Sequence, residues 1–202
     1  MDLYRPAVGG EVMLQEFSEQ VEKTAQAVMS EMHTAIPAKI TSFDPSTGMA
    51  ALKPYGTYTT GAGKKIAYPG VTGVPVIIPQ CPSATVFIAF PIKAGDDCLM
   101  LVSEQELDAW LGGGDSDNDM RFDLTSAIAI PGLSNKGSAV LTEACGSGSV
   151  IVANGGTMLK VNKSDVEIVG DLKVSGDVKA GSISLKNHTH TDSIGGTTTK
   201  PN

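Results

Sequence analysis

Two of the three histidines in this 202-residue chain, His188 and His190, lie near its C-terminus with one residue between them. In an extended strand, residues i and i+2 point to the same side, so the two imidazoles would project together. Two imidazole nitrogens are too few to hold a transition metal firmly. Three copies of the pair around a threefold axis would supply six. The spacing therefore predicts a metal site that needs an oligomer. The alternative is that both histidines are solvated side chains of a polar tail.

The segment before the histidines has the alternation of a β-strand. From Val166 to Ala180 the even positions are apolar or small, and most of the odd positions are charged. The phase changes at Gly181, which is typical of a bulge or corner, and Ile183 and Leu185 then continue the apolar row. We expect an extended wall that buries one face.

One such wall cannot build a core alone, because residues 134–187 contain no aromatic side chain. Three identical chains winding about one axis would bury the three apolar rows against each other. Each buried Val or Leu would contribute about 1.5–3 kcal/mol. We therefore predict a homotrimeric shaft. A β-sandwich formed by a single chain is the alternative.

Residues 13–33 have the periodicity of an amphipathic helix. Their apolar side chains recur every three or four positions: Met13, Phe17, Val21, Ala25, Val28 and Met32. A spacing of seven also relates Leu14, Val21 and Val28. The helix therefore either forms a short coiled coil or lies on its own domain.

Between residues 36 and 103, short β-type runs alternate with turns rich in Gly, Pro and Asp. One example is the pair Ala38–Phe43 and Met49–Leu52, which flank a segment with turn chemistry, Asp44–Gly48. This pattern predicts a small barrel or sandwich. A brief helix from Glu104 to Leu111 is expected to follow it.

Composition and short motifs exclude several functions. The net charge of −7 argues against a nucleic-acid partner. Cys81, Cys98 and Cys145 show neither disulfide nor zinc spacing, so packed thiols are expected. The acidic run Asp115–Asp119 lacks the Gly and Glu of a calcium loop and is interpreted as solvated.

Targeting signals are also missing from the sequence. The start, Met1–Pro6, has neither a basic nor an apolar stretch, so we expect no signal peptide and synthesis in a cytoplasm. No run approaches the roughly 18 apolar residues that a membrane span requires.

Several segments resemble a known family, the central spike proteins of contractile-tailed bacteriophages, also called baseplate spike or baseplate assembly proteins. The resemblance covers about residues 36–133 and is most specific in its ending, which has the pattern DLxxAxAIPGL. Phe122 stands before that Asp, where histidine is frequent in the family. The segments that carry the resemblance are Val74–Pro79, Phe90–Leu99, Glu104–Trp110 and Phe122–Leu133.

The C-terminus resembles the same family. Its spikes end in an HxH motif and a short cap rich in Gly and Thr, which His188-Thr189-His190 and Gly195–Thr199 match. The resemblance implies a homotrimer with an oligonucleotide/oligosaccharide-binding (OB) type barrel, an intertwined three-chain β-helix and a pointed apex. In that apex, His188 and His190 of three chains would hold one iron ion. Six neutral imidazoles suit an octahedral ion better than tetrahedral zinc.

The resulting expectation is a mainly β protein that serves as a structural phage baseplate spike, located in the virion. Its barrel would dock onto baseplate or tail-tube hub proteins, and its apex would pierce the host outer membrane. The expected divisions are an N-terminal segment with the helix (1–35), an OB-fold domain (36–133), a β-helix shaft (134–187) and a metal-binding apex (188–202).

Two other functions remain open. His188, His190 and Asp192 could imitate the two-histidine, one-carboxylate site of a non-haem iron enzyme. A polar tail does not obviously supply the buried pocket that such a site needs. We therefore expect that the protein is not an enzyme and has no catalytic residue. The barrel could instead bind carbohydrate or a receptor, with Tyr55, Tyr58 and Tyr68 as stacking residues.

Overall fold

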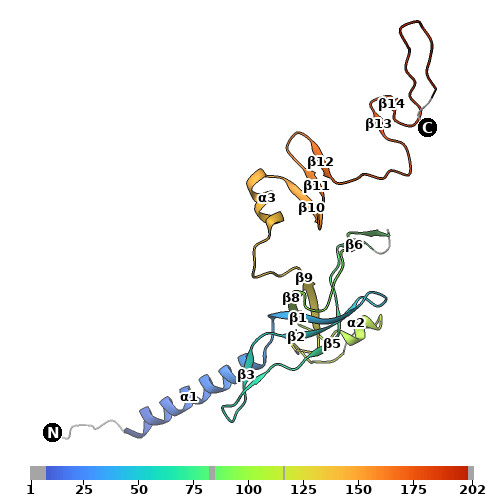
Figure 1. Ribbon diagram of the computed structural model, residues 1–202. Helices are drawn as coiled ribbons and strands as arrows, with labels where there is room; N and C mark the ends of the chain where they lie inside the picture. The colour runs from blue at the N-terminus through green and yellow to red at the C-terminus, as the bar shows by residue number, and fades with distance from the viewer. Residues whose placement is uncertain (1–7, 82–84, 116, 200–202) are drawn as a thin grey trace, which may run out of the picture. The chain divides into compact units, whose positions relative to one another are not determined.

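The computed structural model of the protein describes residues 8–81, 85–115 and 117–199. The chain divides into two compact units, Met1–Asn135 and Lys136–Asn202. The first unit begins with the long helix α1 (Val8–Glu31) and continues as β structure. The second unit contains short strands and one helix (Figure 1). These features confirm the prediction of a mainly β protein with an N-terminal helix.

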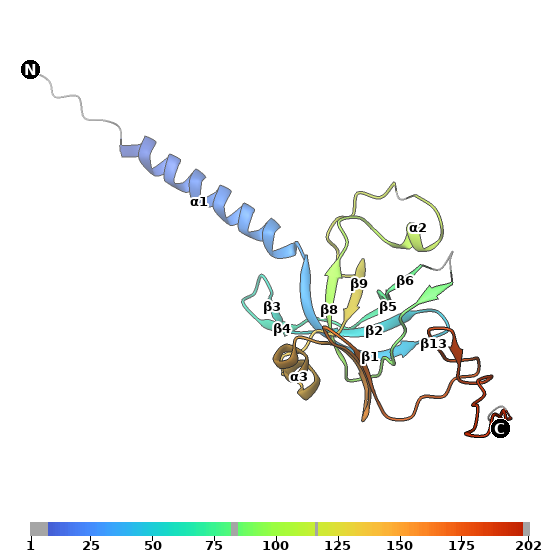
Figure 2. The ribbon, with the colours of Figure 1, turned by 90° about the horizontal axis from the view of Figure 1, so that it is seen from above.

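A curled, five-stranded antiparallel sheet forms the centre of the first unit, in the order β5-β2-β1-β8-β9 (Figure 2). Its strands are β1 (Ala35–Asp44), β2 (Met49–Pro54), β5 (Val71–Pro75), β8 (Asp97–Val102) and β9 (Ala127–Pro131). Just beyond β5, a parallel bridge joins Val76 to Ala129, and the Ile77 N–H donates to the Ala129 carbonyl at 2.8 Å. The sheet therefore curls until its two edge strands meet at this single bridge. We refer to this curled sheet as the half-barrel.

Every second side chain along parts of the strands points into the interior of the half-barrel and fills it. Along β1, Ala38 and Ile40 are buried, whereas Lys39 and Thr41 are exposed. The other strands contribute similar aliphatic or small side chains. The largest of the fully buried core side chains are Ile40, Leu52, Val74, Cys98 and Met100.

The turn between β1 and β2 is fixed by Asp44, as its turn chemistry predicted. The Asp44 carboxylate accepts hydrogen bonds from the Ser46 N–H at 2.9 Å and the Ser46 hydroxyl at 2.6 Å. These bonds favour the ionised carboxylate and lower the pKa of Asp44. Gly48 ends the turn with φ of 73°, a conformation that glycine adopts without strain.

Smaller elements border the sheet. One hairpin consists of β3 (Thr57–Thr59) and β4 (Lys65–Ala67), and another of β6 (Gln80–Cys81) and β7 (Val86–Phe87). The short helix α2 (Asp108–Leu111) begins four residues later than expected from Glu104. The backbone before it forms turns instead, in which the Gln105 N–H donates to the Ser103 hydroxyl oxygen.

Helix α1 confirms the predicted amphipathic helix but ends at Glu31 rather than at residue 33. The His33 N–H donates to the Phe122 carbonyl at 3.3 Å, so this residue is tied to the half-barrel and not to the helix. Every side chain from Met13 to Ser30 is exposed. The alternative in which the helix lies on its own domain is therefore wrong.

The second unit contains a three-stranded antiparallel sheet and a helix that the sequence interpretation missed. The strands are β10 (Val150–Asn154), β11 (Thr157–Val161) and β12 (Val166–Val169). The helix α3 (Ala139–Ser147) is capped by Ser138, whose hydroxyl accepts the Leu141 N–H at 3.0 Å, and it ends at Gly148 in the left-handed conformation. Both caps were local signals that could have found it.

The expected continuous strand from residue 166 to 180 is also wrong. It stops at Val169, because Gly170 takes a φ of 114°. Pairing resumes only in a short hairpin of β13 (Lys179–Ala180) and β14 (Ile183–Ser184). Gly181 lies in the turn of that hairpin with φ of 62°, which confirms the predicted corner.

Only one of the three cysteines behaves as a packed thiol. Cys98 is fully buried, whereas Cys81 and Cys145 are exposed, which corrects the expectation for these two. Burial, with a smaller effect from the neighbouring Asp97 carboxylate, raises the pKa of the Cys98 thiol to about 11.

We predict that Cys98 resists alkylation at pH 8 in the folded protein. The experiment uses a Cys81→Ser, Cys145→Ser variant, so that only Cys98 can react with iodoacetamide. Mass spectrometry should find almost no adduct under native conditions and complete labelling in guanidinium chloride, because the thiolate is both disfavoured and inaccessible. Equal labelling rates in the two conditions would contradict the buried position.

Candidate functional site

The two C-terminal histidines follow a turn rather than a strand. The His188 N–H donates to the Ser184 carbonyl at 2.9 Å, so residues 184–188 curl into one turn. The expectation of an extended backbone into the motif is therefore wrong. The structure nevertheless brings the two rings together. Their centroids lie 5.0 Å apart, and the His188 and His190 planes meet at 85°.

Hydrogen bonds determine which nitrogen of His188 is free. Its Nδ1 lies 3.1 Å from the Ser184 carbonyl oxygen and 3.0 Å from that of Leu185. A carbonyl oxygen can only accept, so Nδ1 carries a proton, and in the neutral imidazole Nε2 then keeps its lone pair. Metal-binding histidines commonly donate their second ring N–H in this way, which fixes the ring orientation.

The ring separation can be compared with what a shared ion requires. Two imidazoles at neighbouring corners of an octahedron, with metal–nitrogen bonds of about 2.1 Å, have ring centroids about 4.6 Å apart. The observed 5.0 Å is close to this value. The pair is therefore compatible with two adjacent positions around one ion.

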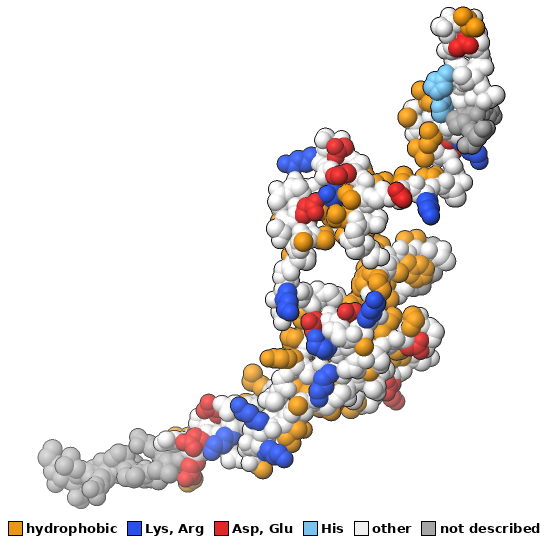
Figure 3. All heavy atoms as spheres, viewed as in Figure 1, with side chains coloured by type: hydrophobic (Ala, Val, Ile, Leu, Met, Phe, Trp, Pro, Cys, Tyr) orange, Lys and Arg blue, Asp and Glu red, His pale blue; other side chains and the backbone are white. Residues whose placement is uncertain are grey.

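One chain does not complete a metal site. Within the described residues, no group of three His, Cys, Asp or Glu side chains is close enough to hold a metal. His188 is half-buried and His190 is exposed. Figure 3 shows the pale-blue histidine side chains on the surface of the C-terminal segment. The described part of one chain therefore supplies at most two of the ligands that a metal would need.

Asp192 shapes the tip of the chain. Its Oδ1 accepts hydrogen bonds from the Ile194 N–H at 3.0 Å and the Gly196 N–H at 2.7 Å. Across this loop, the Thr198 N–H donates to the His190 carbonyl at 2.8 Å. A Cβ at Gly196 would lie 2.6 Å from Asp192 Oδ2, so any larger residue there would require the carboxylate to move. The carboxylate therefore closes a tight loop directly beyond the histidines.

The base of this region is held by a second carboxylate. The Asp177 Oδ1 accepts the Lys186 N–H at 3.1 Å, and the Leu185 N–H donates to the Val178 carbonyl. The Ser184 hydroxyl bond and then the Lys186 bond lower the pKa of Asp177. These contacts fix the β13–β14 hairpin from which the histidines emerge.

One face of the β10–β11–β12 sheet is apolar and uncovered. Residues directly opposite in an antiparallel sheet share a face, and Val150 faces Val161, which in turn faces Val166. The next row has the same character. The face therefore consists of six exposed side chains: Val150, Val152, Leu159, Val161, Val166 and Ile168.

The opposite face of this sheet carries charged side chains and is covered by helix α3. There Lys160 faces Ile151 and Glu167 in the two neighbouring strands. Its ammonium contacts the Glu143 carboxylate of α3 at 2.5 Å, and this contact is the largest cause of the raised pKa of Lys160. Helix α3 therefore packs on this face and leaves the apolar face open.

Exposure of apolar side chains continues along the rest of the unit. Among the described residues 136–199, no hydrophobic side chain is buried, whereas the buried hydrophobic residues of the chain all lie between Ala38 and Ala129. The exposed side chains beyond the sheet are Leu172, Val174, Val178, Ile183, Leu185 and Ile194. A soluble monomer rarely exposes such a continuous apolar surface.

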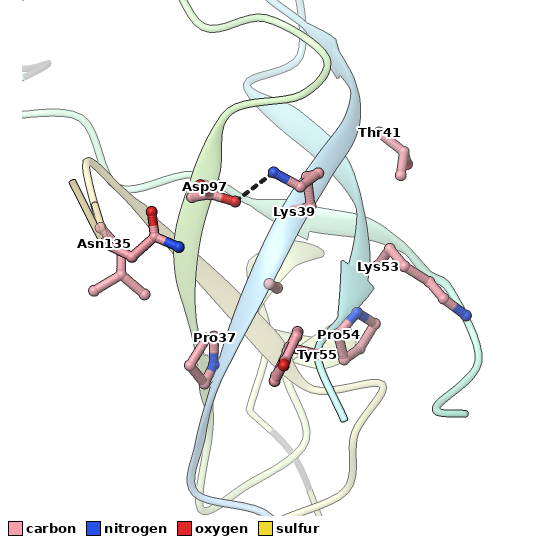
Figure 4. Close-up of a pocket in the computed structure, with 10 residues that line it drawn as sticks. Pro37, Lys39, Thr41, Lys53, Pro54, Tyr55, Asp97 and Asn135 are labelled. Carbon is pink, nitrogen blue, oxygen red and sulfur yellow. Dashed lines mark hydrogen bonds and ion pairs between the residues drawn. The ribbon is translucent and has the colours of Figure 1, made fainter. Parts of the chain in front are cut away.

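The three tyrosines proposed for carbohydrate binding are not gathered into one platform. Tyr58 stacks on Tyr68 with centroids 5.5 Å apart, and His33 meets the edge of Tyr68 at the same distance. Tyr55 instead lines a hollow of about 490 Å³ over β1 and β2 (Figure 4). It is the one aromatic side chain lining that hollow.

The charged groups of this hollow already have partners. The Lys39 ammonium lies 2.6 Å from the Asp97 carboxylate, the contact dashed in Figure 4. The Lys53 ammonium donates to the Tyr68 carbonyl at 2.7 Å. The hollow thus offers a largely apolar surface with paired charges, which gives little support to a carbohydrate site.

Comparison with known proteins connects the first unit to bacteriophages. Residues 36–132, slightly less than half of the chain, match the family model described as the phage protein Gp138 N-terminal domain. The match supports a phage structural protein, and this suggests the virion as its location. No curated protein matches the chain. Among the described residues, no helix has the length and apolarity to cross a membrane.

We predict that Val152→Asp destabilises the native assembly, whereas Ala153→Asp has little effect. Both positions are exposed in β10, but Val152 lies on the apolar face and Ala153 on the other. If another chain covers the apolar face, the new carboxylate is desolvated at a cost of several kcal/mol. Thermal unfolding and solution mass provide the comparison. Identical behaviour of the two variants would contradict a covered face.

Proposed function

We propose that this protein is the central spike of a phage baseplate, a homotrimer that pierces the host outer membrane when the tail contracts. The observation that carries the proposal is that no hydrophobic side chain is buried among residues 136–199. Six exposed hydrophobic side chains line one face of the sheet there. Three chains that cover these faces mutually would form a rigid shaft.

The first unit supports a docking role at the other end of such a spike. Strand order β5-β2-β1-β8-β9, with a parallel bridge between the edges, agrees with the five-stranded, partly open barrel of an OB fold. We infer that this barrel docks onto baseplate or tail-tube hub proteins. The net charge of −7 disfavours nucleic acid as its ligand.

We further propose that three copies of His188 and His190 hold one iron ion at the apex. The support is the short distance between the rings and the free Nε2 of His188. Such an ion would be structural, because six imidazoles fill an octahedron and leave no position for a substrate. It would fix three chain ends together and keep them from fraying.

A structural role also agrees better with the site than an iron enzyme does. The third ligand of the enzyme alternative would be Asp192, whose Oδ1 accepts two backbone N–H groups of its own loop. That oxygen closes the loop instead of facing the histidine pair as part of a three-ligand group.

The oligomeric state tests the proposal directly. Multi-angle light scattering should give about three times the chain mass of 20.9 kDa at micromolar concentration. The expected cause is burial of the apolar rows, each fully buried Val, Leu or Ile contributing about 1.5–3 kcal/mol. A stable monomer with the same secondary structure would overturn both the shaft and the spike.

Metal content tests the apex separately. Purified trimer should contain about one iron per three chains, and His188→Ala or His190→Ala should remove it, because each substitution deletes three of six ligands. His33→Ala is the matched control, since the third histidine of the chain lies beside Tyr68 and should leave the iron in place. Inductively coupled plasma mass spectrometry measures the ratio. Iron retained by a variant that carries both His188→Ala and His190→Ala would refute these ligands.

A further inference from the structure

Helix α1 carries an apolar stripe that contacts nothing within the described chain. Six large apolar side chains of this 24-residue helix are between 51% and 71% exposed: Met13, Leu14, Phe17, Val21, Val28 and Met29. A stripe of this width on an amphipathic helix normally faces a packing partner. The half-barrel does not cover it, so the partner is another molecule.

The distribution of charge along α1 indicates what that partner is. With Leu14, Val21 and Val28 assigned to position a of a heptad, the charged side chains between 13 and 30 all occupy outer positions b, c and f. They are Glu16, Glu19, Glu22 and Lys23. Between Leu14 and Met29, copies of the helix could therefore pack together without bringing like charges into contact. Glu31, the last residue of α1, falls at position d and limits the seam to this segment.

The positions that flank the seam are small or uncharged. Ser18 and Ala25 occupy position e, and Met13, Gln20 and Ala27 occupy position g. None of these five side chains is charged, and the small Ser18, Ala25 and Ala27 allow other helices to approach on both sides of the seam. Thr24, at position d, already satisfies its hydroxyl by donating to the Gln20 carbonyl at 2.8 Å. The surface of the helix is therefore suited to other copies of itself.

We propose that α1 forms a parallel, in-register three-helix coiled coil with the α1 helices of two other copies of this chain. The proposal rests on the homotrimer inferred above, because the seam of about two and a half heptads is marginal for an isolated helix. His33 and Thr34 tie the helix end to the half-barrel through backbone bonds with Phe122 and Val102. In a trimer this tether gives the three helices a high effective concentration.

Cysteine cross-linking of the full chain tests the seam. The background is Cys81→Ser, Cys145→Ser, which removes the exposed native thiols. Val21→Cys places a thiol at position a, and Glu19→Cys places one at the outer position f of the same helical turn. Because in-register a positions face each other, mild oxidation should join up to two of every three Val21→Cys chains into disulfide-linked pairs. Glu19→Cys should give few.

Two further measurements separate the possible failures. Solution mass is determined for each variant under reducing conditions, and Val28→Cys repeats the test one heptad later. A trimeric mass without preferential linkage at residues 21 and 28 would overturn the coiled coil and leave the spike intact, with a different protein as the occupant of the stripe. A monomeric mass would instead overturn the trimer itself, and the coiled coil with it.

Discussion

Folding of a water-soluble protein requires burial of apolar side chains, and among the described residues of this chain a buried hydrophobic core forms in only one of the two units. The half-barrel closes around Ile40, Leu52 and Met100, so its β-strands enclose a core of their own. Beyond residue 135 the strands present apolar rows to solvent instead. The exposed apolar rows of the second unit motivate the proposed shaft, and the exposed stripe of α1 motivates the proposed coiled coil, because in both places the single chain leaves apolar side chains in contact with water.

The histidine pair depends on the same imbalance. Local hydrogen bonds from the turn before His188 and from the Asp192 loop orient the two rings, yet they gather only two ligands in one chain. In the proposed apex, the site would be completed by assembly and not by folding. In the proposed spike, the apolar shaft would bring the chains together, and the ion would then fix their ends.

The two units also differ in how their turns are made. In the half-barrel, Asp44 and Gly48 form a tight connection between long paired strands. In the second unit, Gly170 and Gly181 interrupt short strands before they can extend. These breaks limit the β pairing that a single chain can achieve with itself in this unit.

The sequence by itself determined the features that depend on neighbouring residues. Short β-type runs between turn residues located β1 and β2, alternation of period two located β12, and apolar residues at every third or fourth position located α1. Turn residues and a change of phase located the corners at Gly48 and Gly181. The proximity of His188 and His190 also followed from their spacing. These features could be predicted because each arises from backbone geometry over a few residues.

Only the tertiary structure decided which surfaces are covered and which groups meet. It showed that α1 does not lie on the half-barrel and that α3 covers one face of its sheet. It also placed Tyr55 apart from the stacked Tyr58 and Tyr68. The physical reason is that burial and contact depend on residues far apart in the chain, such as Glu143 with Lys160. No local pattern in the sequence specifies such pairs.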